Sequence, residues 1–204
     1  QGGCQNRGMS LRARPQAIHQ LLDSRMSRLD ALCRDAGVPF YDDAGVDSHL
    51  ERVLLASDFA FESFLQDPGL LGPELVRLMN DPRHADARVA PFAMAMSDEE
   101  FRGELRRFRR REAIRLIWRD VNHVDGIETT LTGASVLAEV CLETALRHAE
   151  RQLAARHGVV RNARGEVQRL VVLALGKLGG SELNFSSDID LVYAPAGVLG
   201  SQEA

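Results

Sequence analysis

The sequence contains few aromatic residues, few cysteines, no long apolar run and no large excess of either charge. Aromatic side chains make up 5% of the 204 residues, which is low for a β-sandwich and ordinary for a helical protein. Because no run of about 18 apolar residues occurs, no segment is predicted to cross a membrane. The formal net charge of −4 argues against a dedicated nucleic-acid-binding protein, which usually carries a strong basic excess.

The three cysteines, Cys4, Cys33 and Cys141, are far apart and are not at metal-ligand spacing. An odd number of isolated cysteines favours a reduced, cytoplasmic compartment over a disulfide framework. Residues 1–14 lack the apolar core of a secretory signal. The chain begins at Gln1 rather than at a methionine, so we expect it to be a piece of a longer protein.

Apolar residues at helical spacing predict helices over most of the first 157 residues. The predicted helices span residues 16–33, 47–66, 73–79, 97–121 and 128–157. Residues 80–96, rich in proline and alanine, are predicted to be a linker. Ser97 and Glu100 have the spacing of a capping box, which marks the start of a helix. Gly158 suits the position just after a helix end.

The pattern changes to short strands and turns after Gly158. Residues 170–175 form a continuous apolar run with β-branched members, which predicts a strand buried on both faces. A glycine-rich turn follows at 176–180, and residues 181–183 are predicted to start a helical turn whose N–H groups face an anion. Residues 188–193 are predicted to form a second strand.

Two carboxylates and a glycine turn in this segment indicate a phosphate-transfer site. Asp188 and Asp190 are two apart in the predicted strand, so they should lie on one face and repel each other unless a cation lies between them. Mg²⁺ is typically held by one or two carboxylates together with substrate phosphates, and such pairs serve two-metal nucleotidyl transfer. Gly179 and Gly180, followed by Ser181, would let backbone N–H groups approach a phosphate.

Two better-known phosphate motifs are excluded. A P-loop requires Ser or Thr after Gly176-Lys177, where this chain has Leu178, and a glycine where it has Val171. The dinucleotide fingerprint Gly-x-Gly-x-x-Gly is absent. An Asp-x-Asp pair or a Gly-Gly turn alone often has no catalytic role, but their combination after an apolar strand favours a nucleotidyltransferase site. Lys177 suits either a phosphate contact or a solvated turn.

The motifs GKLGG at 176–180 and NFSSDIDL at 184–191 resemble the signature of the glutamine synthetase adenylyltransferase/adenylyl-removing enzyme family. This family belongs to the DNA polymerase β-like nucleotidyltransferase superfamily. LRRFRRRE at 105–112 with IWRD at 117–120 resembles the family's helix before the site. The resemblance covers roughly residues 50–195 and is most specific over residues 168–193.

The resemblance implies a piece of a large enzyme with two nucleotidyltransferase halves. One half attaches AMP from ATP to a tyrosine of glutamine synthetase, and the other removes it by phosphorolysis to give ADP. NFSSD and the arginine-rich helix resemble the N-terminal, adenylyl-removing half. By resemblance Asp188 and Asp190 bind Mg²⁺, Gly179 and Gly180 cradle phosphate, and Ser187 supports the strand entry. The implied partners are glutamine synthetase and the PII signal protein, with neither nucleic acid nor membrane.

Two positions depart from the expected pattern. Ser181 stands where the family commonly has arginine, which puts a phosphate contact from that side chain in doubt. The superfamily uses a third carboxylate on a later strand, whereas only residues 191–204 follow Asp190 and Glu203 lies too near the end. We therefore expect these 204 residues alone to have little or no activity.

Several features admit a second interpretation. The arginines of residues 102–119 could bind RNA or steer an acidic partner, but a solvated helix face paired with Glu104, Glu112 and Asp120 is favoured. Trp118 and Cys141 are predicted to pack in the core. The alternatives to the adenylyl-removing function are another polymerase β-like transferase, such as a PII uridylyltransferase, and a non-catalytic docking module for glutamine synthetase.

The predicted fold class is α+β, a mainly helical region followed by the start of a polymerase β-like nucleotidyltransferase α/β unit that the chain does not complete. Four segments are predicted: a disordered polar lead over 1–15, a helical region and linker over 16–96, two long paired helices over 97–157, and an incomplete nucleotidyltransferase core over 158–204.

Overall fold

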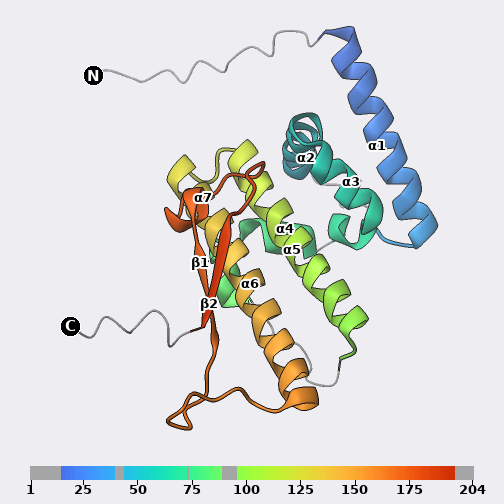
Figure 1. The fold of residues 1–204 in the computed structure, drawn as a ribbon. Helices are drawn as coiled ribbons and strands as arrows, with labels where there is room; N and C mark the ends of the chain where they lie inside the picture. Colours follow the sequence, from blue (N-terminus) through green and yellow to red (C-terminus); the bar gives the residue numbers. More distant parts are fainter. Residues whose placement is uncertain (1–14, 40–43, 73, 89–95, 196–204) are drawn as a thin grey trace, which may run out of the picture. The chain divides into compact units, whose positions relative to one another are not determined.

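The computed structural model describes residues 15–39, 44–72, 74–88 and 96–195, which form two compact units (Figure 1). The first unit ends at Leu75 and the second begins at Val76. Nearly all of the predicted polar lead, part of the predicted linker and Glu203 lie outside the described residues. Among the described helices, none is both long and apolar enough to cross a membrane.

The described elements are mostly helical (Figure 1). Up to residue 80 they are α1 (Gln16–Ala36), α2 (Ala44–Ala56), α3 (Asp58–Gln66), the 3₁₀ helix η1 (Pro68–Leu71) and α4 (Glu74–Asn80). After residue 80 the elements are the 3₁₀ helix η2 (Ala85–Arg88), α5 (Asp98–Val121), α6 (Ile127–His157), β1 (Leu170–Ala174), α7 (Gly176–Gly179) and β2 (Leu191–Pro195).

The single helix predicted over residues 47–66 is wrong, because the chain breaks there into α2 and α3 at Ser57. Ser57 has an extended backbone (φ −142°), and its hydroxyl accepts a hydrogen bond from the Ala60 N–H at 3.1 Å. A serine that caps a new helix in this way competes with continuation of the preceding one. The apolar periodicity runs through the break because both helices bury their apolar side chains.

One arginine ties the helices of the first unit together. Arg25 of α1 donates a hydrogen bond to the Leu54 carbonyl at the end of α2 and pairs with Asp58 at the start of α3. Its guanidinium also lies 4.9 Å from the centre of the Phe61 ring. The apolar core of this unit comes from all of its helices and consists of Leu22, Leu29, Cys33, Leu50, Val53, Leu54, Ala60, Phe61, Phe64, Leu70, Leu71 and Leu75.

The predicted ends of the two long helices are confirmed. Ser97 and Glu100 form the reciprocal capping box of α5, with the Ser97 N–H 2.9 Å from Glu100 Oε2 and the Glu100 N–H 3.3 Å from Ser97 Oγ. The hydrogen bonds from the Ser97 backbone and hydroxyl lower the pKa of Glu100. Gly158 follows the last residue of α6 with φ +79°, a conformation that disfavours other residues.

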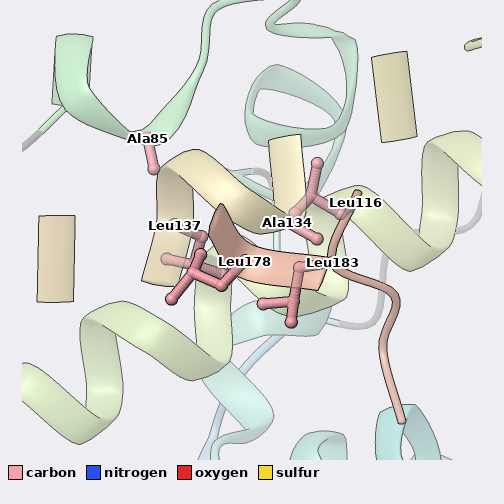
Figure 2. Close-up of a cluster of buried hydrophobic side chains, with 6 residues drawn as sticks. All are labelled: Ala85, Leu116, Ala134, Leu137, Leu178 and Leu183. Atoms are coloured by element: carbon pink, nitrogen blue, oxygen red, sulfur yellow. The ribbon is translucent and has the colours of Figure 1, made fainter. Parts of the chain in front are cut away.

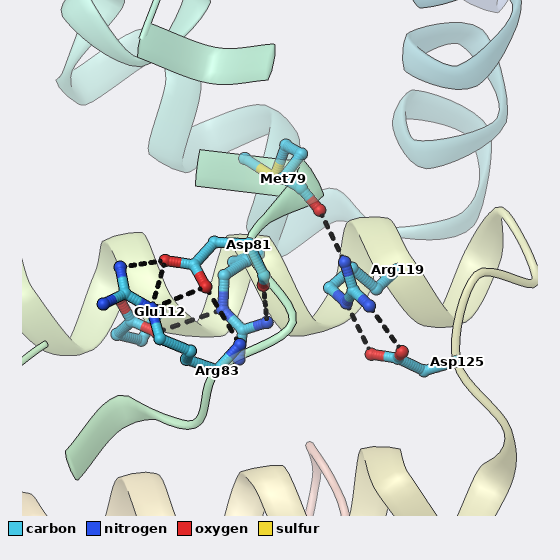
Figure 3. Close-up of polar contacts among 7 residues, drawn as sticks. Met79, Asp81, Arg83, Glu112, Arg119 and Asp125 are labelled. Atoms are coloured by element: carbon cyan, nitrogen blue, oxygen red, sulfur yellow. Dashed lines mark hydrogen bonds and ion pairs between the residues drawn. The ribbon is translucent and has the colours of Figure 1, made fainter. Parts of the chain in front are cut away.

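The solvated arginine face predicted for α5 is correct only in part. Arg107 pairs with Glu104 on the surface, as predicted. Arg115 and Arg119 are instead buried and hold the chain before α5 (Figure 3). Arg115 donates to the Asp81 carbonyl at 3.0 Å and pairs with the buried Glu112 at 3.2 Å. Helical spacing alone could not distinguish these arginines from exposed ones.

Arg119 uses all three nitrogens of its guanidinium group in contacts drawn in Figure 3. Its Nε and Nη2 donate to the two carboxylate oxygens of Asp125 at 2.6 and 2.7 Å, and its Nη1 donates to the Met79 carbonyl at 2.9 Å. The hydrogen bond from Arg119 is the main cause that lowers the pKa of Asp125. These three hydrogen bonds fix the α5–α6 connection, which contains Asp125, relative to the end of α4, which contains Met79.

The described strands form a two-stranded antiparallel sheet in which Val172 lies opposite Tyr193 and Leu173 opposite Val192. The prediction that the first strand is buried on both faces is wrong. Leu173 is 39% exposed and Val192 is 44% exposed. One face contacts the helices through Ala174 and Leu191, while Leu173 and Val192 lie on the other face. A continuous apolar run shows that both faces are apolar but not what covers them.

Candidate functional site

The glycine turn and the loop after it are anchored in an apolar cluster of the second unit (Figure 2). Leu178 of α7 and Leu183 of the loop are 2% and 7% exposed. They pack among four side chains of η2, α5 and α6, namely Ala85, Leu116, Ala134 and Leu137. Leu178 and Leu183 therefore anchor the turn and the loop in the core of this unit.

A buried serine of α6 adds a polar anchor beside this cluster. Ser135 is 1% exposed, its hydroxyl accepts a hydrogen bond from the Leu183 N–H at 3.1 Å, and it donates to the Leu131 carbonyl at 3.0 Å. This contact satisfies a backbone donor that the apolar surroundings would otherwise leave unpaired. Sequence reasoning missed Ser135, because its partner lies 48 residues away.

The helical turn predicted over residues 181–183 is wrong, because the turn is formed earlier, by α7. Ser181 has φ +57°, a left-handed conformation that ends a right-handed helix. Its N–H donates to the Leu178 carbonyl at 3.0 Å, and its side chain is exposed. The order observed is therefore strand, glycine-rich helical turn, extended loop and strand.

Gly179 is required by the shape of this turn. A Cβ at this position would lie 2.5 Å from the Ala174 carbonyl oxygen, which belongs to β1 and has little freedom to move. Gly180 differs, since a Cβ there would lie 3.7 Å from the nearest atom, the Gly176 carbonyl oxygen. Of the two glycines predicted to cradle a phosphate, only the first is sterically demanded by the chain itself.

The strand predicted over residues 188–193 is wrong at its start, because β2 begins only at Leu191. The two predicted metal-binding carboxylates therefore lie just before the strand and not in it, and both residues are exposed. The Asp190 carbonyl accepts a hydrogen bond from the Leu175 N–H at 2.9 Å, which continues the strand pairing by one step. A Cβ on Gly176 would lie 3.9 Å from Asp190 Oδ2. The Asp190 carboxylate therefore lies against the start of the glycine turn, and Asp188 precedes it by two residues.

Two exposed carboxylates beside a glycine turn fit the ligand preference of Mg²⁺, which completes its shell with water and phosphate oxygens. Within residues 15–39, 44–72, 74–88 and 96–195, no group of three or more His, Cys, Asp or Glu side chains is arranged to hold a metal ion.

Lys177, predicted as either a phosphate contact or a solvated turn residue, and Ser187, predicted to support the strand entry, are brought together. Lys177 Nζ lies 3.1 Å from Ser187 Oγ, and Ser187 Oγ lies 2.6 Å from Asn184 Oδ1. Asn184 also accepts a hydrogen bond from the Ser186 N–H at 3.2 Å. Asn184 was not among the predicted site residues. An asparagine two residues before a serine is a typical signal for this kind of turn.

Two side chains of α6 have structural roles. Cys141 packs against the apolar cluster, and burial raises the pKa of its thiol to about 11, as expected of a small apolar core residue. His148 stacks on Phe101 with ring centres 3.7 Å apart, and its Nε2 lies 2.8 Å from Asp98 Oδ1. The hydrogen bond from His148 lowers the pKa of Asp98. Trp118 is buried, as predicted.

Comparison with known proteins gives a consistent result. The family model for glutamate-ammonia ligase adenylyltransferase matches residues 48–203. Proteins named bifunctional glutamine synthetase adenylyltransferase/adenylyl-removing enzyme are similar to this chain. One from Xanthomonas campestris pv. campestris (strain B100) is 44% identical over 179 residues, 87% of this chain and 18% of the relative.

Two further relatives of the same name show similar coverage. The one from Stenotrophomonas maltophilia (strain K279a) is 40% identical over 180 residues, 88% of this chain and 18% of the relative. The one from Thioalkalivibrio sulfidiphilus (strain HL-EbGR7) is 38% identical over 195 residues, 92% of this chain and 20% of the relative. The chain thus spans about a fifth of the length of these relatives.

These similarities place a mainly helical α+β chain in a class of nucleotidyl-transferring enzymes. Within that class, the chain belongs to the glutamate-ammonia ligase adenylyltransferase family.

Proposed function

We propose that residues 158–204 form the beginning of a polymerase β-like nucleotidyltransferase site with Asp188 and Asp190 as its metal-binding pair. The observation that carries this proposal is the position of the Asp190 carboxylate against Gly176, held there by the Leu175–Asp190 backbone hydrogen bond. This arrangement puts a negative side chain, and any cation bound to it, beside the turn that carries Lys177.

The residues divide into cation-binding and phosphate-binding groups. Asp188 and Asp190 would hold Mg²⁺, which neutralises charge on the transferring phosphate when bound. Lys177 offers an ammonium positioned by Ser187. The N–H groups of Gly179 and Gly180, predicted to cradle phosphate, instead donate to the carbonyls of Leu175 and Gly176 at 3.3 and 3.1 Å. The Ser181 N–H likewise donates to the Leu178 carbonyl, and its side chain is too short to replace the arginine that is common in the family.

The reaction that we propose is removal of AMP from a tyrosine of glutamine synthetase. An oxygen of inorganic phosphate attacks the phosphorus of the AMP–tyrosine linkage, and the bond from that phosphorus to the tyrosine oxygen breaks. The products are ADP and a tyrosine that regains its proton. Support comes from the names of the relatives and from residues 184–188, NFSSD, which resemble the adenylyl-removing half.

The partners follow from this reaction. Adenylylated glutamine synthetase is the macromolecular substrate, inorganic phosphate the second substrate and ADP the nucleotide product, with ATP used by the opposing half of a longer protein. The PII signal protein is the proposed regulator. The assignment of glutamine synthetase is supported by the names of the relatives. The PII protein is proposed only from the resemblance to the family.

The test uses the longer protein that contains this chain, with glutamine synthetase in its adenylylated and unmodified forms. We expect ADP to form from the adenylylated enzyme, Mg²⁺ and phosphate. A protein that binds glutamine synthetase but forms no ADP would support a docking module instead. A protein in which loss of the carboxylate pair abolishes only ATP-dependent addition of AMP would assign this chain to the opposite half.

A further inference from the structure

Three side chains near the carboxylates form a hydrogen-bonded relay that the proposed function does not explain. It runs from Lys177 Nζ to Ser187 Oγ at 3.1 Å and from Ser187 Oγ to Asn184 Oδ1 at 2.6 Å. Asn184 Oδ1 also lies 3.2 Å from the Ser186 backbone nitrogen and 3.3 Å from Ser186 Oγ. A single amide oxygen therefore organises the residues that lead into the carboxylate segment.

The relay has a fixed direction. An ammonium group carries only donors, so the Ser187 hydroxyl must accept from Lys177. The one hydrogen of that hydroxyl is then free to point at Asn184, whose amide oxygen is only an acceptor. Asn184 thereby keeps a lone pair of Ser187 turned toward the ammonium. The Lys177–Ser187 hydrogen bond then restricts the long, flexible lysine side chain.

We propose that Asn184 is a positioning residue that, through Ser187, holds the Lys177 ammonium beside the glycine turn, where it binds phosphate. The inference rests on the proposed function and adds to it a residue that touches no substrate. Lys177 uses one of its three donors on Ser187, which leaves two for phosphate oxygens. Anchoring by Leu178, which is 2% exposed, fixes the backbone from which the lysine extends.

The chain offers a matched control. Asn162 forms the same kind of turn, with its Oδ1 accepting from the Arg164 N–H and the Glu166 N–H, each at 2.9 Å. That turn carries none of the proposed site residues. Asn162 also donates from Nδ2 to Glu166 Oε2 at 2.7 Å, so replacing either asparagine by leucine removes three local hydrogen bonds. Asn162→Leu therefore reports the cost of losing an asparagine turn away from the proposed site.

The test measures kcat and the KM for inorganic phosphate in the longer protein that contains this chain. Asn184→Leu and Ser187→Ala should each raise the KM for phosphate about five- to tenfold, the size expected for one hydrogen bond, with a smaller change in kcat. Ser187→Thr, which keeps the hydroxyl, should raise the KM less than Ser187→Ala does, and Asn162→Leu should stay within about twofold of the parent protein.

A double-mutant cycle separates positioning from a general structural role. Lys177→Met should raise the KM for phosphate, and Lys177→Met with Asn184→Leu should raise it no further. An Asn184→Leu variant with an unchanged KM, or one whose effect multiplies that of Lys177→Met in full, overturns the inference. The proposed function fails separately if Asp188→Asn with Asp190→Asn keeps full phosphorolysis.

Discussion

Single residues at the glycine turn are constrained to very different degrees although the sequence presents them as a matched pair. Gly179 lies against the carbonyl of Ala174, whereas Gly180 has ordinary space for a methyl group. Gly180 also has φ −88°, a conformation that any residue adopts. Sequence reasoning identified the pair as a unit, because the steric conflict depends on how the turn folds back onto β1.

Alanine at the two positions should therefore give different results. Gly179→Ala must move the turn away from β1, and we expect it to lower the free energy of unfolding by about 1–3 kcal/mol. Gly180→Ala should change it by less than about 0.5 kcal/mol. Urea unfolding of the 204-residue chain, followed by circular dichroism, measures both. Equal effects at the two positions would contradict the steric account.

The ion pair between Arg119 and Asp125 predicts that stability depends on pH. The folded-state pKa of Asp125 is lowered, so its contribution is present above the unfolded-state pKa of about 3.9 and is lost as the pH falls through the lower folded value. Asp125→Asn leaves the buried Arg119 without its charge partner, and we expect a loss of about 3 kcal/mol at pH 7.

Unfolding measured between pH 7 and pH 3 tests this sign. The difference between the parent chain and Asp125→Asn should shrink as the pH falls below about 4, because the carboxylate is then progressively protonated. Glu139→Gln, at an exposed position on α6, serves as the control and should show no such convergence. A difference that stays constant down to pH 3 would refute a charge-based role for Asp125.

At the scale of elements, α6 supports the site segment, although the two are far apart in the sequence. It supplies Ala134 and Leu137 to the apolar cluster and the Ser135 hydroxyl to the Leu183 backbone. The capping box and the helix end were predictable, because they depend on neighbouring residues. The contact between α6 and the loop was not predictable, because it depends on a long-range contact that spacing does not encode.

Removal of the Ser135 hydroxyl should loosen the loop. Ser135→Ala leaves the buried Leu183 N–H without this acceptor, which costs about 1–3 kcal/mol. Hydrogen exchange should show faster exchange of the Leu183 amide in the variant, while amides in α1 keep their rates. Thr144→Val, a change on the same helix outside this contact, is the control. An unchanged Leu183 amide would show that the loop does not depend on this bond.

The break between α2 and α3 gives a second prediction at this scale. Ser57→Ala removes the hydroxyl that caps α3 and should lower the free energy of unfolding by about 1 kcal/mol. Ser57→Asn retains a capping oxygen and should stay close to the parent chain. Thermal unfolding compares the three proteins. Equal stability of Ser57→Ala and the parent would mean that the cap is not what separates the helices.

For the whole molecule, the sequence predicted the α+β class, the helical region and the two strands, and the structure agrees at that level. It predicted the strand burial wrongly, because an apolar run does not reveal which face is covered. It also placed the short helix after the glycines, because the left-handed Ser181 leaves no pattern in the sequence. The nucleotidyltransferase identity of the last segment stays a proposal supported by the family.

The 204 residues alone should have little or no activity. Two carboxylates are present at the site, and the described residues provide no third acidic, histidine or cysteine ligand for a metal. We expect incubation of this chain with Mg²⁺, phosphate and adenylylated glutamine synthetase to release no more than traces of ADP. Turnover near that of the longer protein would show that the third carboxylate is not needed.

The central claim is that Asp188 and Asp190 are the metal-binding pair on which the reaction at this site depends. The most direct measurement is ADP release from adenylylated glutamine synthetase by the longer protein with Asp188→Asn and Asp190→Asn, beside Glu182→Gln as the control for an exposed acid in the same loop. We predict that the double variant loses ADP release while it still binds glutamine synthetase, and that the control stays active. Unchanged ADP release by the double variant would contradict the assignment.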